Sequence, residues 1–414
     1  MYKSRFRRWG LWKHNPTNHE SPSLSRHTHA SDDLDGEETL YRAVRDYYNG
    51  AFSARRWAYR DDNPLGFQDR SAEERTHQAL ARGNEVYVRF RAAVMLLERP
   101  CRGNNGGKPG DFAQGVRLIR ISFAELSDIF LGSTMEPPML PLWLLYIMLL
   151  FRESLARDFS PVEMQLQKHL AGLTSSSPIA ARSRHPTSLL WRALVAPNAT
   201  RPSIPLSRHH LNTIAGLTAS LFSSHIGPLH PWTVELSNFA IGLLLPNGHG
   251  LTQEKAARFQ SFSNRLDTLP VYDLRHINTV CCFASHYRHH GAHDPSALHS
   301  GIALLEGVLG NPMKRQVVRQ HPDHEFNMYS LLANMNDKLG RWAVAEGWMH
   351  RGVELAKRER QRTGQDGDLF EGLNGLEVVL RAQGKVEEAD AVMEERRALV
   401  REALEGVGER EDSV

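Results

Sequence analysis

Apolar residues recur at intervals of three and four along most of the chain, which is the spacing of amphipathic helices. The first such stretch begins near Glu38 and is ended by Gly50. Alternating β-branched runs of the kind that form hairpins are almost absent. The pattern therefore predicts an all-α fold. Further helices are expected at 72–98, 112–131, 138–158, 161–172 and 185–195.

The clearest internal regularity lies towards the C-terminus, where two segments match at an offset of 44 residues. Gly340 matches Gly384 (384 − 340 = 44), and Ala345 matches Ala389 at the same offset. Glycine permits a sharp turn between antiparallel helices, and a small alanine lets them approach closely. The spacing resembles that of the longer tetratricopeptide repeats. An ordinary pair of helical hairpins without repeat ancestry is the alternative.

Stacked repeats need about three or more units to bury their faces, so upstream helices are expected to complete the array. An earlier unit is expected over Val271–Leu309, with Gly291 at its turn, although Pro295 shifts its second helix. The predicted fold class is a helical hairpin array, a tetratricopeptide-like solenoid with a disordered basic N-terminal segment. Such an array is suited to holding a peptide or protein partner.

Breaks rich in Ser, Pro, Gly and acidic residues suggest how the chain is divided. Residues 16–38, which end in a run of carboxylates, have the composition of a disordered linker. The expected divisions are an N-terminal segment 1–15, the linker 16–38, helical regions 39–180 and 181–270, the repeats 271–404 and a disordered tail 405–414.

Positive charge is concentrated at the N-terminus. The whole chain carries a net charge of +3, but residues 1–30 hold six Lys and Arg against Glu20 alone, which gives +6 − 1 = +5. The rest therefore sums to +3 − 5 = −2. A basic end on a slightly acidic body favours contact with nucleic acid or an acidic partner. A solvated tail is an equal alternative.

Aromatic and basic residues interleave in the same segment. The residues concerned are Tyr2, Arg5, Phe6, Trp9, Gly10, Lys13 and Asn15. In this order they resemble the closing segment of the cryptic loci regulator five domain, a helical module at the N-terminus of many fungal proteins. The family's earlier helices precede this segment, so the resemblance implies a module truncated at Met1. Segments 41–57 and 185–195 loosely match later phrases of the same proteins.

The resemblance implies a fungal nuclear protein with a role near chromatin or transcription. Its basic residues are the candidates for phosphate contact. These candidates are Lys3, Arg5, Arg7, Arg8 and Lys13. Trp9 and Gly10 are interpreted as structural. The alternative, from a different class, is a helical-repeat scaffold that binds a protein partner without touching DNA.

Three cysteines, at 101, 281 and 282, form no disulfide framework and fit a reducing compartment. The nucleus is the expected location, with the cytoplasm as the alternative. The most apolar run, 139–151, is shorter than the roughly 20 residues that span a bilayer. It is interpreted as a buried helix, and no membrane partner is expected.

Candidate chemistry is sparse. If 281–290 is helical, Cys282, His286 and either His289 or His290 share one face and could hold zinc with a further ligand. A buried cysteine pair followed by surface histidines is the favoured interpretation. Gly107-Lys108 is followed by proline, which does not fit a phosphate loop. We expect no metal, no cofactor and no enzymatic activity.

Overall fold

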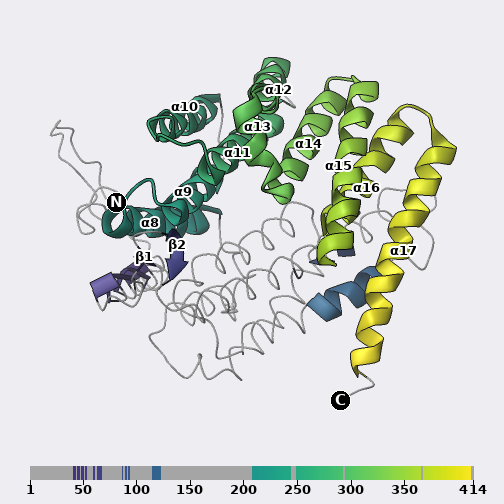
Figure 1. Cartoon of the computed structure of the whole chain (residues 1–414), viewed down its shortest axis with the longest axis horizontal. Helices are drawn as coiled ribbons and strands as arrows, with labels where there is room; N and C mark the ends of the chain where they lie inside the picture. The colour runs from purple at the N-terminus through teal and green to yellow at the C-terminus, as the bar shows by residue number, and fades with distance from the viewer. Residues whose placement is uncertain are drawn as a thin grey trace, which may run out of the picture. The chain divides into compact units, whose positions relative to one another are not determined.

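A computed structural model provides the fold (Figure 1). The chain divides into two compact units, Met1–Glu38 and Thr39–Val414. All the described residues belong to the second unit. They are 41–42, 44–46, 48–50, 52–53, 59–60, 63–67, 86, 89–90, 92–93, 114–122, 208–243, 249–291, 294–364 and 367–411.

Helices dominate the described residues, which confirms the predicted all-α helical array (Figure 1). Two short strands, β1 (Tyr59–Arg60) and β2 (Asn63–Phe67), also pair in an antiparallel ladder that the sequence pattern did not indicate. The labelled helices are α8 (Arg208–Ile226), α9 (Pro231–Leu243), α10 (His249–Leu266), α11 (Leu274–His290), α12 (Pro295–Gly310), α13 (Pro312–Arg319), α14 (Pro322–Lys338), α15 (Trp342–Thr363), α16 (Gly367–Ala382) and α17 (Val386–Glu411).

Proline and a polar cap begin several of these helices. Pro295, Pro312 and Pro322 each occupy the first turn, where the missing N–H would have no helical partner. The Asp294 carboxylate accepts from the Ser296 N–H at 2.9 Å and so caps α12. Pro295 is therefore the start signal of α12 and no obstacle to the earlier hairpin that the sequence predicted.

The two turns related by the 44-residue offset have the same hydrogen bonds. Gly340 and Gly384 adopt φ values of 70° and 76°, a left-handed conformation that favours glycine. In the first turn the Gly340 N–H donates to the Asp337 carbonyl oxygen, and the next N–H donates to the Asn336 carbonyl oxygen. In the second turn the Gly384 N–H donates to the Arg381 carbonyl oxygen, and the next N–H donates to the Leu380 carbonyl oxygen. Each pair of bonds closes the preceding helix and reverses the chain.

A small residue follows each turn, near the start of the second helix of the hairpin, where the helices pack together. Ala345 and Ala389 are both fully buried. Helices α14 to α17 share one hydrophobic cluster, and α11 to α14 share another. Leu309 and Trp348 pack against both clusters, so the packing continues from one hairpin to the next.

The earlier hairpin, α11 with α12, is closed by a different device. Gly291 has an ordinary helical φ of −61°, so its backbone does not require glycine. A Cβ atom at this position would lie 2.0 Å from Leu298 Cδ2. Glycine is therefore needed at position 291 because the Leu298 side chain packs closely against it. This explains why a turn without left-handed geometry still carries glycine.

One predicted boundary is wrong. Residues 405–411 were assigned to a disordered tail, but α17 continues through them to Glu411. Adding a residue to an existing helix gains a backbone hydrogen bond without a new nucleation step, so Gly406 and Gly408 do not end it. Segments 1–38, 139–151 and 185–195 lie outside the described residues, and the predictions made for them stay predictions.

Gly384→Ala should lower the free energy of unfolding by about 1–2 kcal/mol, because an L side chain is strained at φ 76°. A Cβ here meets nothing within 4 Å, so the effect is backbone strain alone. Gly347→Ala, in the exposed interior of α15, is the matched control and should raise stability by about 0.5–1 kcal/mol. Urea unfolding of both variants checks the opposite signs; shifts in one direction would contradict this account.

Candidate functional site: an arginine-lined groove

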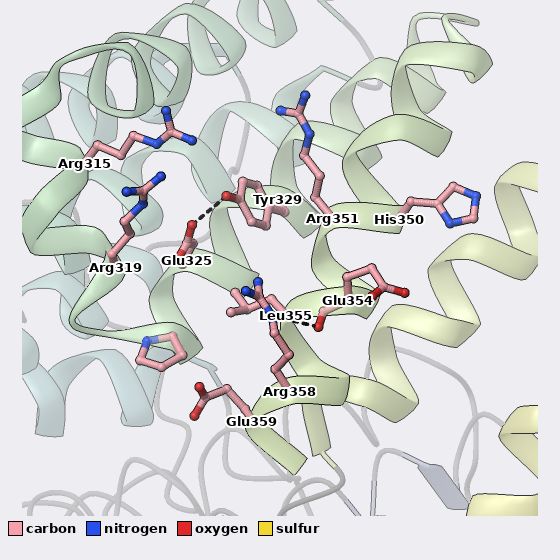
Figure 2. Close-up of a pocket in the computed structure, with 11 residues that line it drawn as sticks. Arg315, Arg319, Glu325, Tyr329, His350, Arg351, Glu354, Leu355, Arg358 and Glu359 are labelled. Atoms are coloured by element: carbon pink, nitrogen blue, oxygen red, sulfur yellow. Dashed lines mark hydrogen bonds between the residues drawn. The ribbon is translucent and has the colours of Figure 1, made fainter. Parts of the chain in front are cut away.

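A groove of about 960 Å³ lies where α13, α14 and α15 meet. This volume is at the upper end of the range found for ligand pockets. Figure 2 shows side chains from the three helices around it, with α14 in the middle. The lining residues are Arg315, Arg319, Pro322, Glu325, Tyr329, His350, Arg351, Glu354, Leu355, Arg358 and Glu359.

The first wall is the short helix α13. Asn311 ends α12 and its side chain accepts from the N–H groups of Met313 and Lys314, at 3.0 and 3.2 Å. The chain therefore starts a new helix after a single residue. Val318, fully buried, anchors α13 in the core. Arg315 and Arg319, four residues apart, share the face that lines the groove (Figure 2).

The opposite wall is α15, where Arg351, Leu355 and Arg358 follow the i, i+4, i+7 spacing of one helical face. The guanidinium of Arg351 lies 4.6 Å from the centre of the Trp348 ring, in a cation–π contact. Arg358 Nε donates to the Glu354 carbonyl oxygen at 3.3 Å. Both side chains are thus supported by their own helix and are exposed in the groove.

The floor comes from α14. Tyr329 Oη donates to the Glu325 carboxylate at 2.6 Å, and both residues are buried. Burial and this neighbouring carboxylate raise the pKa of Tyr329 to about 12, so its hydroxyl remains protonated and donates. The Tyr329 ring also stacks on Trp348 at 5.6 Å between centroids. The floor is therefore tied to the wall that carries Arg351.

The groove carries four arginines and three glutamates, and two of the glutamates already have partners. Glu325 already accepts from Tyr329, and Glu359 accepts from two nitrogens of Arg362 at 2.6 and 2.9 Å. Within the described part of the chain, the guanidinium groups of Arg315 and Arg319 have no hydrogen-bond or ion-pair partner. Like charges four residues apart disfavour a helix by a few tenths of a kcal/mol. An anion bound between the walls would remove that repulsion.

The site residues expected from the sequence lie elsewhere. Lys3, Arg5, Arg7, Arg8 and Lys13, with Trp9 and Gly10, are outside the described residues. The repeat residues Gly340, Ala345, Gly384 and Ala389 are at the turns and helix contacts described above, and none of them lines the groove.

The cysteine and histidine cluster lies on α11. Cys282 Sγ is 3.5 Å from Asn278 Oδ1, and burial raises the pKa of its thiol to about 12. His286 is buried, with its ring centre 4.4 Å from that of His290. A protonated thiol is a poor metal ligand. Across the described residues, no group of three or more His, Cys, Asp or Glu side chains is placed to hold a metal ion.

The groove was missed by sequence reasoning, although part of its signal was visible. The segment 312–319 reads Pro-Met-Lys-Arg-Gln-Val-Val-Arg and carries three cations with no acidic residue. That composition indicates a basic surface, but it does not reveal that α15 places Arg351 and Arg358 on the other side.

Comparisons with protein families, with curated proteins and with solved structures find no match for this chain. None of the helices in the described part of the chain is both long enough and apolar enough to cross a membrane.

Proposed function

We propose that this protein is a helical-array scaffold that binds an acidic polypeptide segment in the groove between α13 and α15. The observation that carries the proposal is the placement of four arginines on the two walls, with Arg315 and Arg319 lacking protein partners among the described residues. Guanidinium groups bind carboxylates through paired, charge-assisted hydrogen bonds. The proposed activity is binding, without a catalytic step.

The groove favours a peptide over nucleic acid as its ligand. Glu354 and Glu359 lie on the α15 wall, and their carboxylates would repel a continuous phosphate backbone. A peptide carries its charges on separate side chains, so it can meet the arginines without lying along those carboxylates. This proposal agrees with the protein partner that the sequence analysis expects for the array.

Binding of a fluorescein-labelled octaglutamate peptide to the full chain tests the proposal by fluorescence anisotropy. Arg315→Gln combined with Arg319→Gln should weaken binding roughly tenfold or more, equivalent to about 1.4 kcal/mol or more. Binding should also weaken as salt is added, because the groove is open to solvent.

The matched control removes the same charge elsewhere. Arg258 on α10 and Arg401 on α17 are exposed, and neither lines the groove. Arg258→Gln with Arg401→Gln should leave octaglutamate affinity within about twofold of the unmodified protein, a change of roughly 0.4 kcal/mol. An equal loss in both double variants would show that net charge, and not the groove, attracts the peptide.

A nuclear, chromatin-associated role with DNA contact through the N-terminus is the second candidate. It is favoured by the charge of +5 in residues 1–30. The same experiment with labelled duplex DNA tests this candidate. It predicts binding that depends strongly on salt and is unchanged by the groove substitutions. That binding should fall when Arg5, Arg7 and Arg8 are changed to Ala. DNA binding lost with the groove arginines would overturn the peptide proposal.

A further inference from the structure

A second hollow adjoins the arginine groove along α13 and the end of α12. Its volume is about 600 Å³, and it shares Arg315 and Arg319 with the groove. The two hollows therefore meet at these side chains. Together they follow α13.

The second hollow differs in chemistry from the groove. Apart from the shared arginines it is lined by Leu309, Gly310, Pro312, Gln316 and Gln320. None of these five side chains carries a charge. Leu309 and Pro312 offer apolar contact, and Gly310 exposes its backbone. Gln316 and Gln320 contribute amide groups. It suits an uncharged, apolar side chain.

The geometry sets the spacing between the two parts of a ligand. Pro312 in the second hollow and Arg319 lie seven residues apart on α13, a rise of about 10 Å, and an extended peptide advances about 3.3 Å per residue. A peptide that follows α13 therefore needs about three residues between the side chain in the groove and the side chain in the second hollow.

We propose that the ligand is a linear peptide motif in which acidic residues lie about three positions from an apolar residue. The acidic side chains bind Arg315 and Arg319 together with the α15 arginines, and the apolar side chain enters the second hollow. This inference rests on the proposed function and adds the feature that distinguishes one acidic peptide from another.

Gly310 provides a variant that fills the second hollow. A Cβ atom there meets nothing within 4 Å, and Gly310 is exposed at the end of α12. Gly310→Phe therefore places a ring in the hollow without displacing the core. Gly307→Phe is the matched control, since Gly307 is on the same helix, is equally exposed and open, and lines neither hollow.

The probes are labelled peptides with three glutamates and a leucine three positions before or after them, and the same peptides with serine in place of leucine. On the unmodified full chain at least one leucine peptide should bind about tenfold more tightly than its serine partner. Gly310→Phe should abolish that advantage and leave the serine peptides unaffected, whereas Gly307→Phe should preserve it.

The outcomes separate the two proposals. If leucine gives no advantage, or if Gly310→Phe leaves the advantage intact, the two-part motif is wrong, while arginine-dependent binding of octaglutamate still supports the groove. If no acidic peptide binds in an arginine-dependent way, the proposed function and this inference both fail. Circular dichroism of each variant checks that its helices are retained.

Discussion

Replacing Glu377 by alanine should lower the free energy of unfolding by about 3–5 kcal/mol. Glu377 on α16 and Arg396 on α17 are only 1% and 2% exposed, and their Oε2 and Nη2 atoms lie 3.0 Å apart. Arg396 also donates to Asn374 Oδ1 and lies over the Phe370 ring at 5.6 Å. Without the carboxylate, the guanidinium would remain buried and would lose its ion pair with Glu377.

The size of this effect comes from leaving one charge behind and not from the net value of the pair. Replacing both partners, Glu377→Leu with Arg396→Leu, should therefore destabilise less than Glu377→Ala alone. Arg381, which also donates to Glu377 at 3.1 Å, keeps Asp390 as a second acceptor in that double variant.

Urea unfolding gives the free energies, and hydrogen exchange shows whether protection falls in α16 and α17. Glu388→Ala, on the exposed face of α17, is the control and should change stability by no more than about 0.5 kcal/mol. A double variant that is less stable than the single one would contradict the interpretation.

Phe326→Ala should have a comparable effect, about 3–5 kcal/mol, since it empties a buried aromatic site. The ring fits against two glycines: a Cβ at Gly352 would lie 3.4 Å from it, and one at Gly372 would lie 3.2 Å from it. Phe326 follows Glu325 on α14, and Gly352 follows Arg351 on α15. The ring therefore sets the distance between the floor of the groove and its α15 wall, and octaglutamate binding should weaken with stability.

A double-mutant cycle tests the packing of the Phe326 ring against Gly372 on α16. In the unmodified protein Gly372→Ala crowds both Phe326 and Val353, whose Cγ2 atom would be 3.1 Å from the new Cβ. In the Phe326→Ala background the methyl group enters partly vacant space and should be tolerated better. Equilibrium unfolding of the four proteins measures the coupling, and additive effects would show that the ring does not limit the space at Gly372.

The hairpins at 322–411 were predictable because their determinants are local. A turn such as that at Gly340 depends on one residue's backbone and on bonds to the residues just before it. The repeated offset supplied a second copy at Gly384. Both signals can be recognised from the sequence alone.

The groove was not predictable by the same reasoning. Helix α13 has eight residues and falls between the α11–α12 hairpin and the 44-residue repeats, so neither pattern includes it. Arg351 and Arg358, on the opposite wall, come from a helix that begins more than twenty residues after α13 ends. Only the packing of α13 on α14 and of α14 on α15 brings these arginines to one site.

The 44-residue offset also shows where the two hairpins differ. Glu377 is equivalent to Ala333 (333 + 44 = 377) and Arg396 to Gly352 (352 + 44 = 396), so one hairpin has two small residues where the other has an ion pair. Sequences this similar could exchange helices while folding. Pairing α14 with α17 would place Ala333, and not Glu377, opposite Arg396. The ion pair therefore favours the pairing of α17 with α16, which supplies Glu377, over its pairing with α14.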